Sequence, residues 1–130
     1  MSDREKASVG LVTWTDLTVE NAEQIRDFYS AVVGWNPSGV DMGGYSDFNM
    51  NDPRTGNPVA GVCHARGSNA DLPPVWLIYV NVEDIERSVA RCVELGGQVI
   101  SGPKGFGGQG RYCVIRDPAG AALALFEPAK

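Results

Sequence analysis

The stretch DPAGAALALFE, running from Asp117 to Glu127, decides the fold of this chain of 130 residues. Pro118 presets one position of a tight turn and Gly120 supplies a positive φ, so the first four residues predict a hairpin turn. The apolar run that follows predicts a short buried strand.

The same order of residue types occurs about sixty-five positions earlier in the chain. Residues 51–56 read NDPRTG and lead into the apolar run of residues 59–62. Residues 10–34 predict a strand and a helix that ends at glycine, and residues 75–97 predict the same pair. The sequence therefore predicts two copies of one small unit. Because 130 residues are too few for two independent cores, the copies must share one.

The composition is that of a folded, acidic protein. Hydrophobic residues make up 43% of the chain, and the net charge is -5 with eleven Lys and Arg spread along the sequence. A nucleic-acid surface would need clustered basic residues instead. No apolar run approaches the roughly 20 residues of a membrane span, and the first residues lack the apolar stretch of a signal peptide. We therefore expect a cytoplasmic protein with reduced cysteines that binds neither nucleic acid nor membranes.

Hydrophobic periodicity predicts the elements of each unit. A capping box is predicted at Asn21, Gly34 ends the helix that follows, and Asp84 is predicted to cap the second helix. Residues 36–39 and 43–44 have the composition of turns around short strands, and residues 66–74 that of a linker. The predicted helices are residues 21–33 and a second from residue 85 to Gly96, and the predicted strands are residues 9–19, 45–50, 59–65, 76–82, 98–101 and 111–116 and a last strand after Gly120.

Each unit has the predicted order β-α-β-β-β, which gives an α+β fold. One amphipathic helix covers one face of each small sheet and leaves the other face open. Exposing a bare apolar sheet face to water is unfavourable, so we expect the two open faces to curl into a shared concave groove. We place module one at about residues 8–66 and module two at about residues 74–128 of a single domain.

Several short motifs, taken in order, resemble one protein family. They are residues 14–19, Phe28–Tyr29, Gly34–Trp35, residues 59–62, Leu95–Gly97, Gly110–Arg111 and Asp117–Gly120. Together they are similar to the vicinal oxygen chelate superfamily, which includes glyoxalase I, the bleomycin-resistance proteins and the extradiol dioxygenases. The resemblance implies the glyoxalase/bleomycin-resistance/dioxygenase fold, in which two modules form a cupped eight-stranded mixed sheet. It also implies a homodimer with small-molecule pockets in the cups.

Metal-dependent members of that family bind a cation through four His, Glu or Gln side chains, one on the first and one on the last strand of each module. The resemblance matches these places to Trp14, Gly61, Leu77 and Ala124, with Trp76 as the rival at the third place. A divalent ion needs oxygen, nitrogen or thiolate donors, and none of these side chains supplies one. We therefore expect no metal and no cofactor, which disfavours metal-dependent lyase or dioxygenase activity.

The alternation of side chains along strands selects candidates for ligand contact. Trp14 and Asp16 share one face of the first strand, where the indole could stack on a flat ligand and the carboxylate could hold a cationic group. Tyr79 and Asn81 share the corresponding face of the second module. Three further aromatic residues are candidates for the mouth of the groove, namely Tyr45, Phe48 and Phe106.

Catalytic residues are not identified by any motif in the sequence. His64 is the only histidine, so it is the candidate general base if the protein is an enzyme. Residues 105–110 match the spelling GxGxxG but precede a strand, so they predict a mobile loop and not a dinucleotide site. Glu127 lies on the opposite face to Ala124, and we expect it at the solvent end of the last strand.

These features predict a metal-free protein that binds or sequesters a small aromatic or cationic molecule in the cup of its sheet. Two alternatives stay open. The first is a lyase or isomerase that acts on a small carbonyl compound, with His64 as base or with a metal held by other residues. The second is a module that only associates with another protein.

Overall fold

The computed structural model describes residues 8–130. They form two compact units, which we call the first module, Trp14–Trp76, and the second module, made of residues 8–13 and Leu77–Lys130. The N–H of Gly10 donates to the carbonyl of Asn81 at 2.8 Å, and the N–H of Asn81 donates to the carbonyl of Leu11 at 3.0 Å. These two bonds attach the N-terminal segment to the second module.

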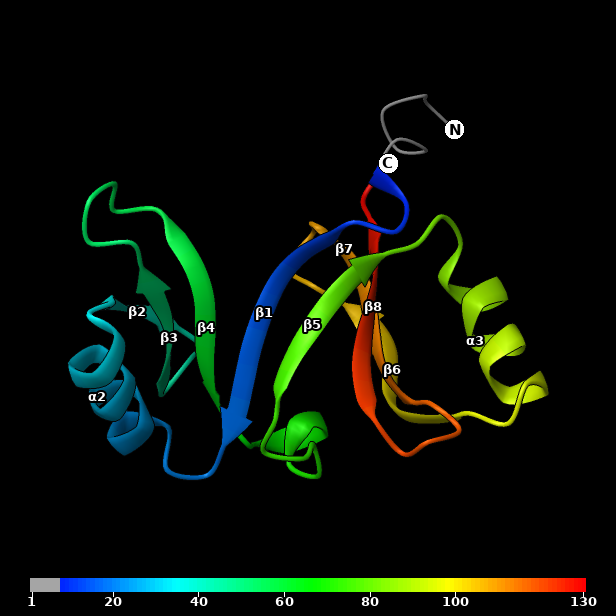
Figure 1. Ribbon diagram of the computed structural model, residues 1–130, viewed down its shortest axis with the longest axis horizontal. Coiled ribbons are helices and arrows are strands. Elements are labelled where there is room, and N and C mark those ends of the chain that lie inside the picture. The colour runs from blue at the N-terminus through cyan, green and yellow to red at the C-terminus, as the bar shows by residue number, and fades with distance from the viewer. Residues whose placement is uncertain (1–7) are drawn as a thin grey trace. The chain divides into compact units, whose positions relative to one another are not determined.

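The first module is a mixed four-stranded sheet with one helix (Figure 1). Its strand order is β2-β3-β4-β1, with β1 parallel to β4 and the other pairs antiparallel. Its elements are β1 (Val12–Val19, which enters the module at Trp14), α2 (Ala22–Val33), β2 (Asn36–Asp41), β3 (Ser46–Asn51), β4 (Pro58–His64) and a short 3-10 turn at Gly67–Asn69.

The second module repeats this arrangement with the order β5-β8-β7-β6 and with β5 parallel to β8. The fold class is therefore confirmed as α+β, with two β-α-β-β-β modules and eight strands in mixed sheets. Its elements are β5 (Trp76–Asn81, which enters the module at Leu77), α3 (Ile85–Glu94), β6 (Gln98–Gly105), β7 (Gly110–Arg116) and β8 (Ala122–Pro128).

Each helix packs against one face of its own sheet. In the first module, the buried Phe48, Met50 and Val62 form a cluster against which α2 packs Ile25 and Tyr29. The second module buries its own cluster beneath α3, made of Ile85, Cys113 and Leu125. Residues of opposite parity on the same strands consequently point to the face of each sheet that carries no helix, which we call the helix-free face.

The sequence predicts the C-terminal end of α2 and the N-terminal start of α3. Gly34 follows α2 with a left-handed φ of 92°, and its N–H donates to the carbonyl of Ser30 at 3.0 Å. Asp84 caps α3 by accepting a hydrogen bond from the N–H of Arg87 at 3.1 Å. The predicted capping box at Asn21 is wrong, because that side chain donates to the side chain of Gln24 and caps no backbone N–H.

Residues 36–39 differ from the predicted turn, because they belong to β2, which runs from residue 36 to residue 41 at the edge of the first sheet. All of β2 is exposed, and it contains Pro37, which an edge strand tolerates because one side of the strand makes no ladder bonds. Strand β6 also extends past the predicted residues 98–101, up to Gly105. The glycine-rich residues 105–110 therefore close the β6–β7 hairpin, where the N–H of Phe106 donates to the carbonyl of Gly110.

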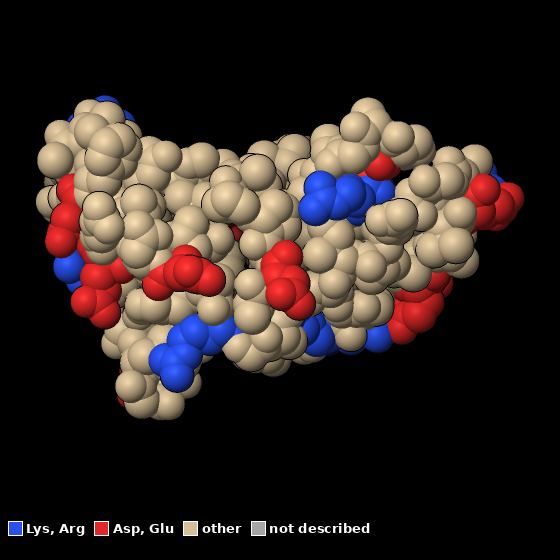
Figure 2. Space-filling model, turned by 90° about the horizontal axis from the view of Figure 1, so that it is seen from below, with Lys and Arg blue, Asp and Glu red and all other residues tan. Residues whose placement is uncertain are grey.

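The surface charge and the lengths of the helices can be compared with the prediction that the protein binds neither nucleic acid nor membranes. On the surface in Figure 2, acidic and basic side chains are interspersed among uncharged residues, and no field of one sign covers it. Neither of the two helices among residues 8–130 is long and apolar enough to cross a membrane.

We predict that Gly110→Ala destabilises the protein by roughly 2 kcal/mol or more. The methyl group would collide with the carbonyl oxygen of Glu127, and the alanine backbone would have to adopt a φ of +146°, which residues with a side chain rarely adopt. Gly105→Ala is the matched control, since a Cβ at that position meets no atom within 4 Å. Urea unfolding of both variants gives the two changes. Equal stabilities would contradict the close approach of β7 and β8 at Gly110.

Candidate functional site

On the helix-free face of the first module, Trp14 and Asp16 of β1 both lie against Gly61 of β4. In the parallel pairing of β1 and β4, Asp16 is directly opposite Gly61. A Cβ added at Gly61 would lie 3.1 Å from the Cβ of Asp16 and 3.3 Å from the Cζ2 of Trp14. The indole therefore extends across β4 in the space that any larger residue at position 61 would fill. This places an aromatic ring and a carboxylate side by side.

Asp16 is buried, with 6% of its surface exposed, although it is charged in its ordinary state. Its neighbour on β4, Cys63, shares this acidic surrounding. Burial raises the pKa of the Cys63 thiol, and the carboxylates of Asp16 and Asp47 raise it further. Cys63 therefore stays a neutral thiol at physiological pH, which removes it as a nucleophile.

His64 lies at the end of β4 and is held by carboxylates. The Oδ1 of Asp47 accepts the backbone N–H of His64 at 2.8 Å and lies 3.2 Å from its Nδ1. On the other side of the ring, the Oε1 of Glu23 in α2 is 3.8 Å from Nε2. Through these contacts His64 links β4 to β3 and to α2, which is a structural role.

Two predicted contact residues, Tyr45 and Phe48, lie near His64. Phe48 is 8% exposed and belongs to the helix-covered cluster, so it does not line the helix-free face. Tyr45 packs edge-on against the His64 ring, with a centroid separation of 5.5 Å, and the guanidinium of Arg66 lies 3.8 Å from the centre of the Tyr45 ring. Both aromatic side chains thus support the fold around β3.

The helix-free face of the second module carries a chain of aromatic rings. Tyr79 contacts Tyr112 at a centroid separation of 6.1 Å. Phe106 in the β6–β7 hairpin contacts Tyr112 at 5.4 Å and Phe126 at 6.0 Å, both edge to face. The ammonium of Lys104 lies 5.2 Å from the centre of the Tyr112 ring. Tyr112 therefore links the predicted residues Tyr79 and Phe106, and sequence reasoning missed both Tyr112 and Phe126.

Asn81 lies on the same strand face as Tyr79 and is held by a bond within the module. Its Oδ1 accepts a hydrogen bond from the hydroxyl of Thr13 at 3.1 Å. The bond uses the carbonyl end of the amide, so the NH2 end is the part that can donate to a ligand. In the parallel pairing of β5 and β8, Asn81 is opposite Phe126, which places the amide beside the aromatic chain.

The residues that the resemblance matches to the family's metal positions offer no ligand for a cation. Trp14 and Gly61 lie together on the first module, but hydrogen offers no electron pair and the indole nitrogen is a donor only. In the second module, Leu77 and Ala124 are fully buried and carry aliphatic side chains. The donor set that a divalent ion needs is thus missing from all four positions.

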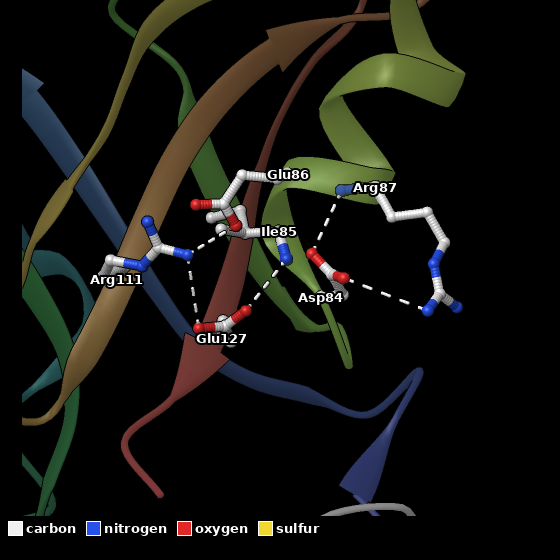
Figure 3. Close-up of polar contacts among 6 residues, drawn as sticks. All are labelled: Asp84, Ile85, Glu86, Arg87, Arg111 and Glu127. Carbon is white, nitrogen blue, oxygen red and sulfur yellow. Dashed lines mark hydrogen bonds and ion pairs between the residues drawn. The ribbon is translucent and has the colours of Figure 1, made fainter.

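Three carboxylates do gather at the start of α3, as Figure 3 shows. Asp84, Glu86 and Glu127 each bring an oxygen within 4.8 Å of the others. All three carboxylates already accept hydrogen bonds within the protein. Asp84 caps the helix, and Glu127 accepts the backbone N–H of Ile85 at 3.0 Å.

Arg111 on β7 completes this network. Its guanidinium pairs with Glu86 and lies 3.5 Å from Glu127. The hydrogen bond from Arg111 lowers the pKa of Glu86, so this pair favours the folded state at neutral pH and is lost as the pH falls through that lowered value. The expectation that Glu127 lies at the solvent end of the last strand is wrong, since its side chain is only 16% exposed and acts as a second cap for α3.

We predict that Glu127→Ala destabilises the protein by roughly 1 to 2 kcal/mol, because the Ile85 N–H loses its acceptor and Arg111 loses a partner. Glu94→Ala is the matched control, since Glu94 pairs with Arg91 on the exposed side of the same helix and should change stability by about 0.5 kcal/mol or less. Thermal or urea unfolding measures both. A Glu127 variant as stable as the control would contradict the capping role.

Known proteins with similar sequences share this architecture. The model of the Glyoxalase/Bleomycin resistance protein/Dioxygenase superfamily matches residues 11–125. The putative glyoxylase CFP32 of Mycobacterium tuberculosis is 32% identical over 132 residues, which cover 98% of this chain and 49% of that protein. The anthracycline biosynthesis protein DnrV of Streptomyces peucetius is 31% identical over 90% of this chain and 46% of its own length. The chain thus spans about half the length of these curated relatives.

Solved structures extend the likeness of fold. Methylmalonyl-CoA epimerase from Mycobacterium tuberculosis superposes with a TM-score of 0.53 at 16% identity, over 93% of this chain and 89% of that one. At this identity the match concerns the fold alone. With the family model covering most of the sequence and both modules showing the expected strand order, the chain belongs to the glyoxalase/bleomycin resistance protein/dioxygenase superfamily.

Proposed function

We propose that this protein binds a small aromatic molecule carrying a cationic group, without a metal ion, and sequesters it. The observation that supports this most directly is the pair of Trp14 and Asp16 around Gly61 on the helix-free face of the first module. The indole offers a large flat surface for stacking and for cation–π contact. The neighbouring carboxylate offers opposite charge to an ammonium group.

Burial favours this role for Asp16. A carboxylate removed from water is costly unless donors or opposite charge compensate it. The two oxygens of a carboxylate accept about four hydrogen bonds, so Asp16 can accept from a ligand in addition to the protein. An ammonium group beside it would therefore bind more strongly than at an exposed carboxylate.

The character of the relatives supports an aromatic ligand. DnrV carries the name of an anthracycline biosynthesis protein, and it matches 90% of this chain. We also propose the homodimer that the family resemblance implies. We place the protein in the cytoplasm, where the three free cysteines would stay reduced.

A glyoxalase-like lyase or isomerase is the second candidate, favoured by the name of the putative glyoxylase CFP32. It would act on a small carbonyl compound and would need a base. His64 is the available imidazole, but it is held between Asp47 and Glu23 on the helix side of β4. A module that only associates with another protein is the third candidate, and the polar and aromatic side chains on the helix-free faces favour it least.

We predict that daunorubicin, a planar aromatic compound with an ammonium group, binds the wild-type protein in isothermal titration calorimetry. Trp14→Ala should weaken binding about tenfold or more through lost stacking, and Asp16→Asn about tenfold through lost charge. Trp35→Phe is the control, since Trp35 packs in the helix-covered cluster and should leave the affinity unchanged. Binding that survives both first-module substitutions would place the ligand elsewhere.

We also predict that protein purified without chelators contains far less than one equivalent of nickel, zinc, manganese or iron by elemental analysis. Adding any of these ions should leave the thermal unfolding midpoint unchanged, because residues 14, 61, 77 and 124 offer no electron pair. One equivalent of tightly held metal, or glyoxalase activity that depends on an added ion, would favour the enzyme over the binding protein.

A further inference from the structure

The helix-free face of the second module combines aromatic rings with a positive charge. We call Lys104, Phe106, Tyr112 and Phe126 the Lys104 aromatic cluster. Three of its members are rings in edge-to-face contact at centroid separations of 5.4 and 6.0 Å. Two of the rings come from neighbouring strands, because Tyr112 on β7 is directly opposite Phe126 on β8. The cluster thus joins side chains of β6, β7, β8 and the β6–β7 turn, with Tyr112 buried at its base and Phe106 exposed.

Lys104 is positioned by the same hairpin. It pairs with Tyr112 across β6 and β7, and its ammonium lies 5.2 Å from the centre of that ring. The contact with the ring places the ammonium on this face. Burial lowers the pKa of Lys104, which means that its charged form is poorly hydrated and gains from a nearby anion.

Phe106 gives a ligand access to this charge. It is the most exposed of the rings, at 37%, and it belongs to the turn of the β6–β7 hairpin. A Cβ added at Gly105, Gly107 or Gly108 would meet no atom within 4 Å, so the space around the turn is open. A flat molecule can therefore reach the exposed ring while one of its substituents reaches Lys104.

We propose that the Lys104 aromatic cluster is a binding site for an aromatic carboxylate, whose ring packs on Phe106 and whose carboxylate pairs with Lys104. The charge of the lysine selects an anion, and an ammonium ligand of the kind proposed for Trp14 and Asp16 would be repelled here. The site is on the other module and has the opposite charge. The two proposals can therefore be tested separately, with different probes and different variants.

The test compares two probes of equal shape, 2-naphthoate and 2-naphthamide, by titration calorimetry on the full chain. On the wild-type protein the carboxylate should bind about tenfold more tightly than the neutral amide, because a charged hydrogen bond replaces a neutral one. Lys104→Met should abolish this preference, and Lys104→Arg should retain it. Lys130→Met is the control, since it removes the same charge from the second module outside the cluster and should keep the preference.

Phe106→Ala separates the ring contact from the charge. It should weaken both probes about tenfold and leave the ratio of their affinities unchanged. A circular dichroism melt of each variant checks folding, and retention of the preference in Lys104→Arg excludes a general packing defect. Equal affinities on the wild type, a preference that survives Lys104→Met, or binding of neither probe would overturn the anion site. None of these outcomes changes the daunorubicin result at Trp14.

Discussion

Each module has one helix for two sheet faces, and the other features of the structure follow from this constraint. Phe48 and Val62 in the first module and Cys113 and Leu125 in the second show how the covered faces bury their apolar side chains. The helix-free faces receive the alternate residues of the same strands, so their aromatic and polar side chains have no helix to pack against. The ligand surface that we propose therefore follows from the alternation of side chains along the strands.

The sequence predicts the helices, most strands and the fold class, because these depend on local periodicity and on turn residues such as Gly34 and Asp84. It does not predict β2, which is polar, exposed and defined only by its pairing with β3. Strand alternation also places Trp14 and Tyr79 on the faces where the structure has them. Lys104 was missed because its position depends on irregular pairing in β6, where the register shifts before that residue.

Glu127 illustrates a second limit of sequence reasoning. Alternation correctly puts it on the face opposite Ala124, but it does not reveal that α3 begins within reach of this carboxylate. The resulting network uses three acidic side chains and Arg111 to satisfy the start of one helix. The helix dipole and its unpaired N–H groups account for this concentration of negative charge without any bound ion.

The two residues at the family's metal positions in the first module are physically coupled. A Cβ at position 61 would lie 3.1 Å from the Cβ of Asp16 and 3.3 Å from the Trp14 ring, so a metal ligand could be introduced there only if the indole shifted. Replacing Trp14 alone would instead leave a gap above a glycine that still offers no donor. Changes at the two positions are therefore non-additive, and neither single change restores a cation site. The indole that crowds position 61 is the same group that we propose for stacking, so both properties depend on Trp14.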